Sequence, residues 1–233
     1  MAQQETALIV GAGPGLSAAL ARLFSKEGMK VALAARDTKK LDGLVKEIRG
    51  RAYPCDGMIP KDVEALFDAV TKDIGEPGLV VYNASGRVRG PITDLDPEAV
   101  RQTIMITCYG GFLVGQAAAK RMIKAGKGTI LFTGASASIK GFANSSAFAM
   151  GKLGLSGLVE SMARELQPQN IHIAQIVIDG GICSPARPER ATSRGPDGCL
   201  DPDAIAQTYL QLHRQHRSAW ASYVELRPWS EKF

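Results

Sequence analysis

The stretch TALIVGAGPGLSAALARLFSKEGMKVALAARD (residues 6–37) decides the fold of this chain. A short apolar run ends in a glycine-rich turn, an amphipathic segment follows, and a second apolar run, KVALAA, comes after it. This pattern predicts a strand, a helix and a parallel strand. Gly11, Gly13 and Gly15 let the backbone approach a pyrophosphate, and the free N–H groups and dipole at the helix start near Leu16 favour its charge. The stretch predicts a dinucleotide site; the alternative is a structural turn in a non-nucleotide α/β scaffold.

The same alternation continues along the rest of the chain. The strand candidates are residues 6–10, 30–35, 51–55, 78–83, 128–133, 172–178 and 220–226. Several are apolar nearly throughout, as strands covered on both faces of a parallel sheet should be. Between them lie segments such as 63–74, where apolar residues recur at helical spacing. We therefore expect one domain over residues 1–233, a doubly wound parallel α/β sheet of the Rossmann-like type.

Composition narrows the class of protein. The chain has 233 residues, 45% of them apolar, enough for one core. Its net charge of +5 comes from scattered Lys and Arg, which disfavours a nucleic-acid face. The first apolar run is too short and too rich in glycine for a signal peptide or a membrane span. Cys55, Cys108, Cys183 and Cys199 lack paired spacing. We therefore expect reduced thiols and a soluble cytoplasmic protein.

The second predicted strand ends with Arg36 and Asp37. In nicotinamide sites a carboxylate near this point holds the ribose 2′-OH, whereas an arginine pairs with a 2′-phosphate. Arg36 comes first, so we expect NADP rather than NAD as cofactor. The alternative is that Asp37 only caps the next helix and Arg36 is a solvated loop residue.

Five groups of residues follow one another along the chain, four of them just after predicted strands and the FxxxK group at the start of a predicted helix. They are the GAGPGLS turn (11–17), Asp56, the NASG segment (83–86), FxxxK (Phe148 to Lys152), and Asp179-Gly180 followed by Ile182 and Ser184. Together they resemble the short-chain dehydrogenase/reductase family over roughly residues 5–185. In that family's glycine motif Ser17 replaces the last glycine, and its small side chain should still let the helix lie close to the strand.

The resemblance implies cofactor roles for residues of these motifs. The cofactor-binding residues are expected to be Gly11, Gly13, Gly15, Leu16, Arg36, Asp56, Asn83, Ala84, Ser85, Lys152, Gly180 and Ile182. In the family pattern Asp56 contacts the adenine, Lys152 holds the nicotinamide ribose, and the segment at Gly180 cradles the nicotinamide. For Lys152 the alternative is a lysine extended along a helix face toward solvent.

The family's catalytic residues carry over poorly. The family uses a tyrosine as proton donor, a lysine, a serine that steadies the carbonyl, and an asparagine that maintains a water-linked relay. The matching positions hold Phe148, Lys152, Ala135 and Thr107, so only the lysine remains. The pattern resembles a subgroup of the family that carries Phe for Tyr and keeps the lysine. It implies an NADP-dependent oxidoreductase with a non-standard active site, or a non-catalytic NADP(H)-binding redox sensor or assembly partner.

Other side chains could replace the missing tyrosine. Tyr109 is the most plausible substitute acid by chemistry, although it could equally be a core residue, and Ser136 would orient a substrate better than protonate it. We therefore expect the catalytic residues to be Lys152, Tyr109 and Ser136. The substrate class is a small carbonyl, alcohol or enoyl compound. No metal site is expected, because His213 and His216 suggest no third ligand.

Arginines cluster in two loops expected beside the ligand site. Arg87 and Arg89 follow the NASG segment, and three more lie in the Pro-, Gly- and Ser-rich segment 184–200, which we expect to be a mobile substrate-side loop. These three are Arg187, Arg190 and Arg194. The arginines suggest an anionic substrate; the alternative is a set of solvated loop side chains. By analogy with the family, a homodimer or homotetramer is also expected.

Overall fold

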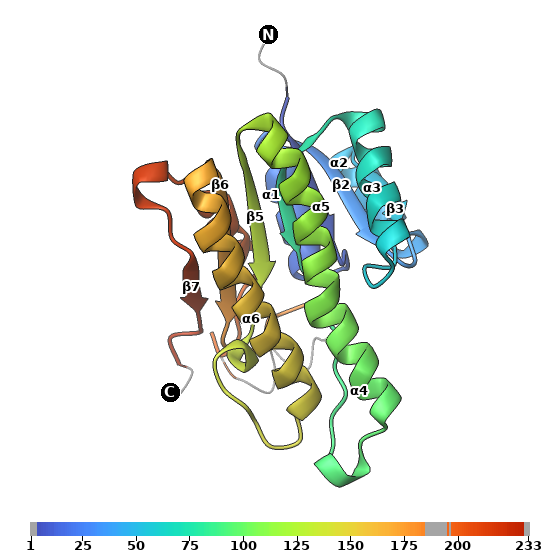
Figure 1. Cartoon of the computed structure of the whole chain (residues 1–233), viewed down its shortest axis with the longest axis vertical. Helices are drawn as coiled ribbons and strands as arrows, with labels where there is room; N and C mark the ends of the chain where they lie inside the picture. Colours follow the sequence, from blue (N-terminus) through green and yellow to red (C-terminus); the bar gives the residue numbers. More distant parts are fainter. Residues whose placement is uncertain (1–3, 185–194, 196, 231–233) are drawn as a thin grey trace.

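The computed structural model describes residues 4–184, 195 and 197–230. In this part of the chain seven strands form one sheet in the order β3-β2-β1-β4-β5-β6-β7, and every neighbouring pair is parallel (Figure 1). The strands are β1 (Thr6–Val10), β2 (Lys30–Ala35), β3 (Arg51–Pro54), β4 (Pro77–Tyr82), β5 (Gly128–Thr133), β6 (Ile171–Ile178) and β7 (Tyr223–Leu226). The predicted parallel α/β sheet in a single domain is confirmed. The predicted last strand, 220–226, begins three residues later than expected.

Helices cover both faces of the sheet (Figure 1). They are α1 (Leu16–Lys26), α2 (Asp42–Ile48), α3 (Pro60–Ile74), α4 (Pro97–Ile104), α5 (Gly110–Ala125), α6 (Ser146–Leu166) and α8 (Pro202–His213). A π-helical turn, Met105–Tyr109, joins α4 to α5. The 3-10 turns are Lys39–Leu41, Ile92–Asp94, Ser136–Ser138, Gln167–Gln169 and Arg217–Ala219. Among the described helices none is long and apolar enough to span a lipid bilayer.

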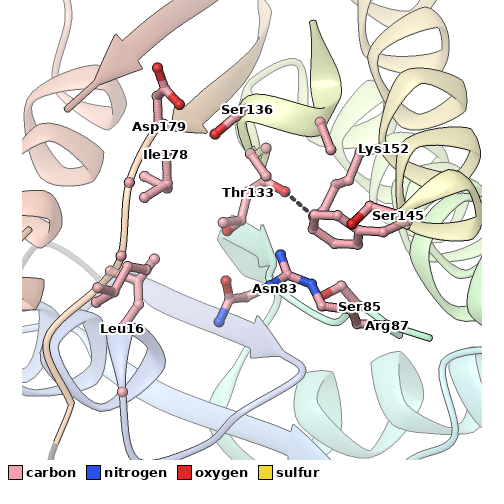
Figure 2. Close-up of a pocket in the computed structure, with 18 of the residues that line it drawn as sticks. Leu16, Asn83, Ser85, Arg87, Thr133, Ser136, Ser145, Lys152, Ile178 and Asp179 are labelled. Carbon is pink, nitrogen blue, oxygen red and sulfur yellow. Dashed lines mark hydrogen bonds between the residues drawn. The ribbon is translucent and has the colours of Figure 1, made fainter. Parts of the chain in front are cut away.

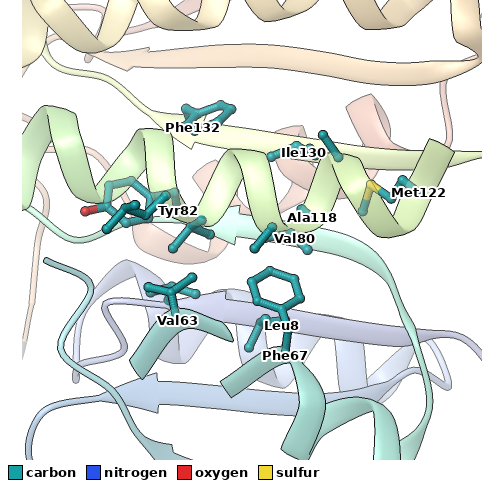
Figure 3. Close-up of a cluster of buried hydrophobic side chains, with 14 of the residues drawn as sticks. Leu8, Val63, Phe67, Val80, Tyr82, Ala118, Met122, Ile130 and Phe132 are labelled. Atoms are coloured by element: carbon teal, nitrogen blue, oxygen red, sulfur yellow. The ribbon is translucent and has the colours of Figure 1, made fainter. Parts of the chain in front are cut away.

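Two apolar clusters lie on opposite faces of the sheet. One joins β-strand residues such as Leu8 and Val80 to the inner faces of α3, α5 and α6 (Figure 3). The predicted stripe of α3 packs here, with Val63 and Phe67 almost fully buried. The other cluster packs α1, α2 and α8 against the opposite face. Because both faces are covered, the central strands are apolar along their whole length, which is the pattern that the sequence shows.

The order of the strands creates a crevice at the carboxyl edge of the sheet. β1 lies between β2 and β4, so the chain winds outward to β3 and then returns to continue on the other side of β1. The connections after β1 and β4 therefore diverge, and parallel sheets bind ligands at such a switch point. This topology places the glycine turn after β1 beside the residues that follow β4.

The expectation that all four cysteines are reduced is wrong for one pair. Cys183 and Cys199 form a disulfide, with Cα atoms 5.7 Å apart. A parallel bridge between Ile182 and Leu200 brings the two segments together, and the Cys183 N–H donates to the Leu200 carbonyl at 2.9 Å. The spacing of the cysteines along the sequence did not indicate this disulfide. The pairing depends on the return of the chain at Leu200 to the segment that follows β6. Cys55 and Cys108 are free thiols.

Part of the expected loop 184–200 falls outside the described residues. Residues 185–194 and 196 are not described, so the predictions for Arg187, Arg190 and Arg194 lie outside the described residues as well.

Candidate active site

A cavity of about 1030 Å³ opens at the carboxyl ends of β1, β4, β5 and β6 (Figure 2). Its lining brings together ten of the residues predicted from the sequence: Gly11, Gly13, Gly15, Leu16, Asn83, Ser85, Ser136, Lys152, Gly180 and Ile182. Most of the expected cofactor residues, with the expected lysine among them, thus line the same cavity.

The glycine turn after β1 packs tightly against the segment after β4. Gly11 has a φ of +86°, and a Cβ atom there would lie 2.4 Å from the backbone nitrogen of Ala84. Ala84 therefore contributes to the site by contact with this turn rather than by lining the cavity. At Gly13, by contrast, a Cβ atom would have no neighbour within 4 Å. Gly11 is required by the packing of the protein itself, whereas Gly13 leaves open space on the cavity side.

Ser17 stands in α1 where the third glycine was expected, and its hydroxyl is used. Its Oγ donates to the Gly11 carbonyl at 3.2 Å and accepts from Asn83 Nδ2 at 2.7 Å. The backbone N–H of Asn83 in turn donates to the Val10 carbonyl at 2.8 Å. Ser17 is only 2% exposed. The departure from the glycine pattern thus ties the β1 turn to the end of β4 through buried hydrogen bonds, each of which stabilises such a link by about 1 kcal/mol.

Arg36, Asp37 and Asp56 lie just after β2 and β3. None of the three lines the cavity. Asp56 Oδ1 accepts a hydrogen bond from the Met58 N–H at 3.0 Å, which fixes its carboxylate in the turn before α3. Arg36 is exposed at the end of β2. Asp37 Oδ1 accepts from the Lys39 N–H at 3.0 Å, so its carboxylate is used at the start of the next helical turn.

Lys152 is buried at the floor of the cavity. Its Nζ donates to the Thr133 carbonyl at 2.6 Å, and its side chain is 3% exposed (Figure 2). Thr133 Oγ1 is 2.8 Å from the hydroxyl of Tyr209, a buried residue of α8. Burial, and secondly the charge of Arg87, lower the pKa of Lys152 to about 7. The lysine does not extend toward solvent, so that alternative is excluded.

Phe148 lies one helical turn before Lys152 and also lines the cavity. Its ring is 6% exposed. The Arg87 guanidinium carbon lies 4.0 Å from the ring centroid, and Lys152 Nζ lies 5.9 Å from it. The ring that stands at the expected tyrosine position is therefore flanked by two cations, at distances where a cation is attracted to an aromatic face.

Comparison with known proteins identifies this arrangement. Residues 5–192 match the family model of the short chain dehydrogenases. The chain belongs to the short chain dehydrogenase family. D-threitol dehydrogenase from Mycolicibacterium smegmatis is 27% identical over 74% of this chain and 68% of that protein. Among solved structures, a short-chain dehydrogenase from Rhodopseudomonas palustris is 33% identical, covers 97% of this chain and 99% of its own, and has a TM-score of 0.84. A metagenomic short-chain oxidoreductase in complex with NADP is 27% identical, with a TM-score of 0.83 over 96% of this chain and 97% of its own.

Ala135 and Thr107 occupy the two other positions that the sequence analysis matched to catalytic residues. Ala135 lines the cavity without a polar side chain, and its N–H donates to Ser138 Oγ at 3.1 Å. Thr107 is fully buried in the π-helical turn, and its Oγ1 accepts from the Gly86 N–H at 3.0 Å. Thr107 thus has a packing role, in a place where it supports the segment after β4.

The structure does not bring Tyr109 to the cavity. Its side chain is 37% exposed and its ring stacks on Phe112 with centroids 6.0 Å apart. Tyr109 is therefore neither a core residue nor part of the cavity lining. Ser136 does line the cavity.

One residue of the site was only partly foreseen. The sequence singled out Arg87 as one of several loop arginines, but not its contact with Phe148. An arginine directly after the NASG segment, together with Phe at the predicted tyrosine position, is the signal that could have indicated this contact.

Proposed function

We propose that the protein is an NADP(H)-dependent oxidoreductase of the short chain dehydrogenase type with a non-standard active site. The observation that carries this proposal is that the glycine turn and the buried Lys152 face the same cavity. The substrate class is a small carbonyl, alcohol or enoyl compound. The relatives support this reading, since the metagenomic oxidoreductase holds NADP and D-threitol dehydrogenase is named for an alcohol substrate.

The residues present fit a dinucleotide. Gly13 leaves room for a phosphate to approach, and the backbone at the start of α1 offers free N–H groups toward the cavity. Gly11, Gly15, Leu16, Asn83 and Gly180 would surround the bound molecule. A bound nicotinamide dinucleotide would supply or accept the hydride.

Preference for NADP over NAD rests on the end of β2. The Asp37 carboxylate is held by the Lys39 N–H, whereas Arg36 is exposed and can reach a 2′-phosphate. We expect NADPH to bind at least tenfold more tightly than NADH in calorimetry. Equal or tighter binding of NADH would contradict this assignment.

The chain's own residues must handle the proton without a tyrosine. Lys152 would hold a ribose hydroxyl, and its charge would stabilise the alkoxide that forms on the substrate oxygen. Ser136 would donate a hydrogen bond to the substrate. Since Phe148 has no acidic proton and Tyr109 lies outside the cavity, the proton would come from water or from the substrate itself.

A second function is favoured by three replaced positions. With Phe148, Ala135 and Thr107 in place of tyrosine, serine and asparagine, the protein could bind NADP(H) without turnover, as a redox sensor or assembly partner. The test is NADPH binding, followed by NADPH oxidation against a panel of aldehydes, ketones and enoyl thioesters. Turnover with any member of the panel supports the oxidoreductase. Tight binding without turnover favours the sensor, and absence of binding contradicts both.

We also propose that the protein forms a homodimer or homotetramer. Tyr109, Phe112, Met150 and Leu153 are exposed apolar side chains on the π-helical turn, α5 and α6. Light scattering on the eluted protein should give a dimer or tetramer mass. Phe112→Glu together with Leu153→Glu should reduce it to a monomer, and a monomeric parent protein would contradict the proposal.

A further inference from the structure

One wall of the cavity contains a disulfide-bonded cysteine. The segment 180–184 follows β6, and its residues that line the cavity are Gly180, Gly181, Ile182 and Ser184. Cys183 lies between the last two of these and forms a disulfide with Cys199, which is not part of the described lining. We call this segment the 180–184 wall. A covalent bond thus joins the wall to a residue outside the cavity.

The 180–184 wall reaches the glycine turn after β1. A Cβ atom added at Gly15 would lie 3.6 Å from Ser184 Oγ. Figure 2 shows the chain after Asp179 running toward Leu16, at the start of α1. Parallel sheets hold dinucleotides at this edge, with a phosphate at the start of the helix, so a bound dinucleotide would contact the wall. The position of the wall therefore affects nucleotide binding.

The disulfide holds the wall through Leu200, the residue after Cys199. The Cys183 N–H donates to the Leu200 carbonyl at 2.9 Å, and the Leu200 N–H donates to the Gly181 carbonyl at 2.8 Å. Leu200 is 8% exposed, and a Cβ atom added at Gly180 would lie 2.9 Å from its Cδ1. When these two hydrogen bonds open, the disulfide keeps Leu200 beside the wall. Cleavage of the disulfide should therefore increase local opening of the wall.

A soluble dithiol can reach this disulfide, because Cys183 and Cys199 are each partly exposed. In thiol–disulfide exchange a thiolate of the reductant attacks one sulfur, and the second thiol of the reductant then releases the protein from the mixed disulfide. The S–S bond breaks, and the dithiol gives up two electrons and two protons and becomes a disulfide. Cys183 and Cys199 end as thiols. Exchange with an oxidised dithiol restores the bond, so the modification is reversible.

We propose that the Cys183–Cys199 disulfide is a redox switch for the binding of NADP(H). The oxidised protein holds the 180–184 wall in the binding position, and reduction by a dithiol releases it. This inference rests on the proposed function and adds regulation of the same site. Because binding and reduction are linked, a nucleotide that binds the oxidised form more tightly must protect the disulfide from reduction by the same factor.

The test uses NADP⁺, which brings no reducing equivalents. Its affinity is measured by calorimetry for the oxidised protein and for protein that was reduced with dithiothreitol and freed of it by gel filtration without oxygen. We expect reduction to weaken NADP⁺ binding about tenfold. In mixtures of reduced and oxidised dithiothreitol, saturating NADP⁺ should raise the ratio needed for half-reduction by the same factor.

Variants assign the effect to this disulfide. Cys183→Ser combined with Cys199→Ser should bind NADP⁺ as weakly as the reduced parent protein and should not respond to dithiothreitol. Cys108→Ser is the matched control, because Cys108 is a free thiol that is also partly exposed. This control should keep the affinity of the parent protein and its full response to dithiothreitol.

The proposal is overturned if the oxidised and reduced proteins bind NADP⁺ equally, if NADP⁺ does not shift the point of half-reduction, or if the double variant still responds to dithiothreitol. The number of thiols that react in denaturant gives a further check. After treatment with oxidised dithiothreitol the thiols of Cys55 and Cys108 should react. Reaction of all 4 cysteines would also overturn the proposal.

Failure of the oxidised protein to bind NADP⁺ contradicts the proposed function instead. Hydrogen exchange at the amides of Cys183 and Leu200 then tests the switch by itself, because these two amides donate the hydrogen bonds between the wall and the Leu200 segment. Faster exchange after reduction supports control of the wall by the disulfide, and unchanged exchange overturns it.

Discussion

The cavity has two halves: a nucleotide half around Gly11, Ser17 and Asn83, and a chemical half around Phe148 and Lys152. The residues of the two halves are constrained in different ways. On the nucleotide half, Gly11 is required by a backbone contact with Ala84, and Ser17 and Asn83 form buried hydrogen bonds. On the chemical half, Phe148 and Thr107 are also buried, and we propose that they replace the tyrosine and the asparagine predicted from the resemblance.

This difference shows that packing constrains the nucleotide half more strongly than the chemical half. A side chain at Gly11 would collide with Ala84 and so disturb the ends of β1 and β4 together. Steric constraints therefore disfavour substitutions in the nucleotide half. A change from Tyr to Phe removes one hydroxyl and leaves the ring in place, so the chemistry can be lost while the structure is kept.

Restoring the missing polar groups should have the largest effect. In Phe148→Tyr combined with Ala135→Ser, both new hydroxyls would face the cavity, because both parent residues line it. We expect NADPH-dependent carbonyl reduction to rise by about 10²- to 10⁴-fold, the usual contribution of a positioned acid. The rate of NADPH oxidation is the measurement, with Phe148→Tyr alone for comparison. An unchanged rate of NADPH oxidation, at unchanged NADPH affinity, would show that the cavity no longer places a substrate beside the nicotinamide.

Gly11→Ala should break the nucleotide half. The new Cβ atom would lie 2.4 Å from the Ala84 nitrogen, at a φ of +86°. Strain and overpacking together should lower the free energy of unfolding by about 2–6 kcal/mol, as measured by chemical denaturation.

Gly13→Ala is the matched control for this change, because a Cβ atom there has open space. It should leave the free energy of unfolding within about 1 kcal/mol and weaken NADPH binding. Equal destabilisation by the two variants would show that the tight packing of the turn is not what requires Gly11.

Lys152 should make stability depend on pH. Its pKa is about 7 in the folded protein and 10.5 is its ordinary value, so between these pH values the unfolded chain holds a proton that the folded one has lost. The free energy of unfolding should therefore rise between pH 7 and 10.5, by about 2–4 kcal/mol relative to Lys152→Met. Below pH 7 the folded protein carries the full cost of the buried charge.

Denaturation at a series of pH values measures this difference. Lys124→Met, at an exposed lysine of α5, should leave the pH dependence of the parent protein unchanged. A parallel pH dependence of the parent protein and Lys152→Met would show that burial of the lysine has no such effect.

Ser17→Ala should have the smallest effect of the four. It removes the hydroxyl that links Gly11 to Asn83, without adding volume to α1. We expect about a three- to tenfold loss of NADPH affinity, the effect of one hydrogen bond. Ser25→Ala, which removes the hydroxyl that donates to the Ile48 carbonyl far from the turn, is the control. An equal loss of affinity in both variants would contradict a positioning role for Ser17.

The fold could be predicted from the sequence because its signals are local. The apolar runs that became β1, β2 and β5 were predicted to the residue, since a buried parallel strand is apolar along its length. The nucleotide half of the cavity was predicted for the same reason. Gly11 and Asn83 directly follow β1 and β4, and these two strands are neighbours in the sheet, so the two residues lie close together.

The rest of the site depends on contacts between distant segments. The contact of Arg87 with Phe148 joins two segments far apart in the sequence, and the pairing of Cys183 with Cys199 follows from the bridge between Ile182 and Leu200. Tyr109 was predicted as a substitute acid, but it lies at the end of a π-helical turn and does not line the cavity, and apolar periodicity does not reveal such a turn.

The contact of Tyr209 with Thr133 links helix α8 to the candidate active site. The family match stops at residue 192, whereas α8 begins at Pro202. Yet Tyr209 of that helix pairs with the residue whose carbonyl holds Lys152. A chain cut at the family boundary would expose the apolar face of α1 and remove the neighbour of Thr133. Helix α8 therefore supports the candidate active site from outside, although none of its residues lines the described cavity.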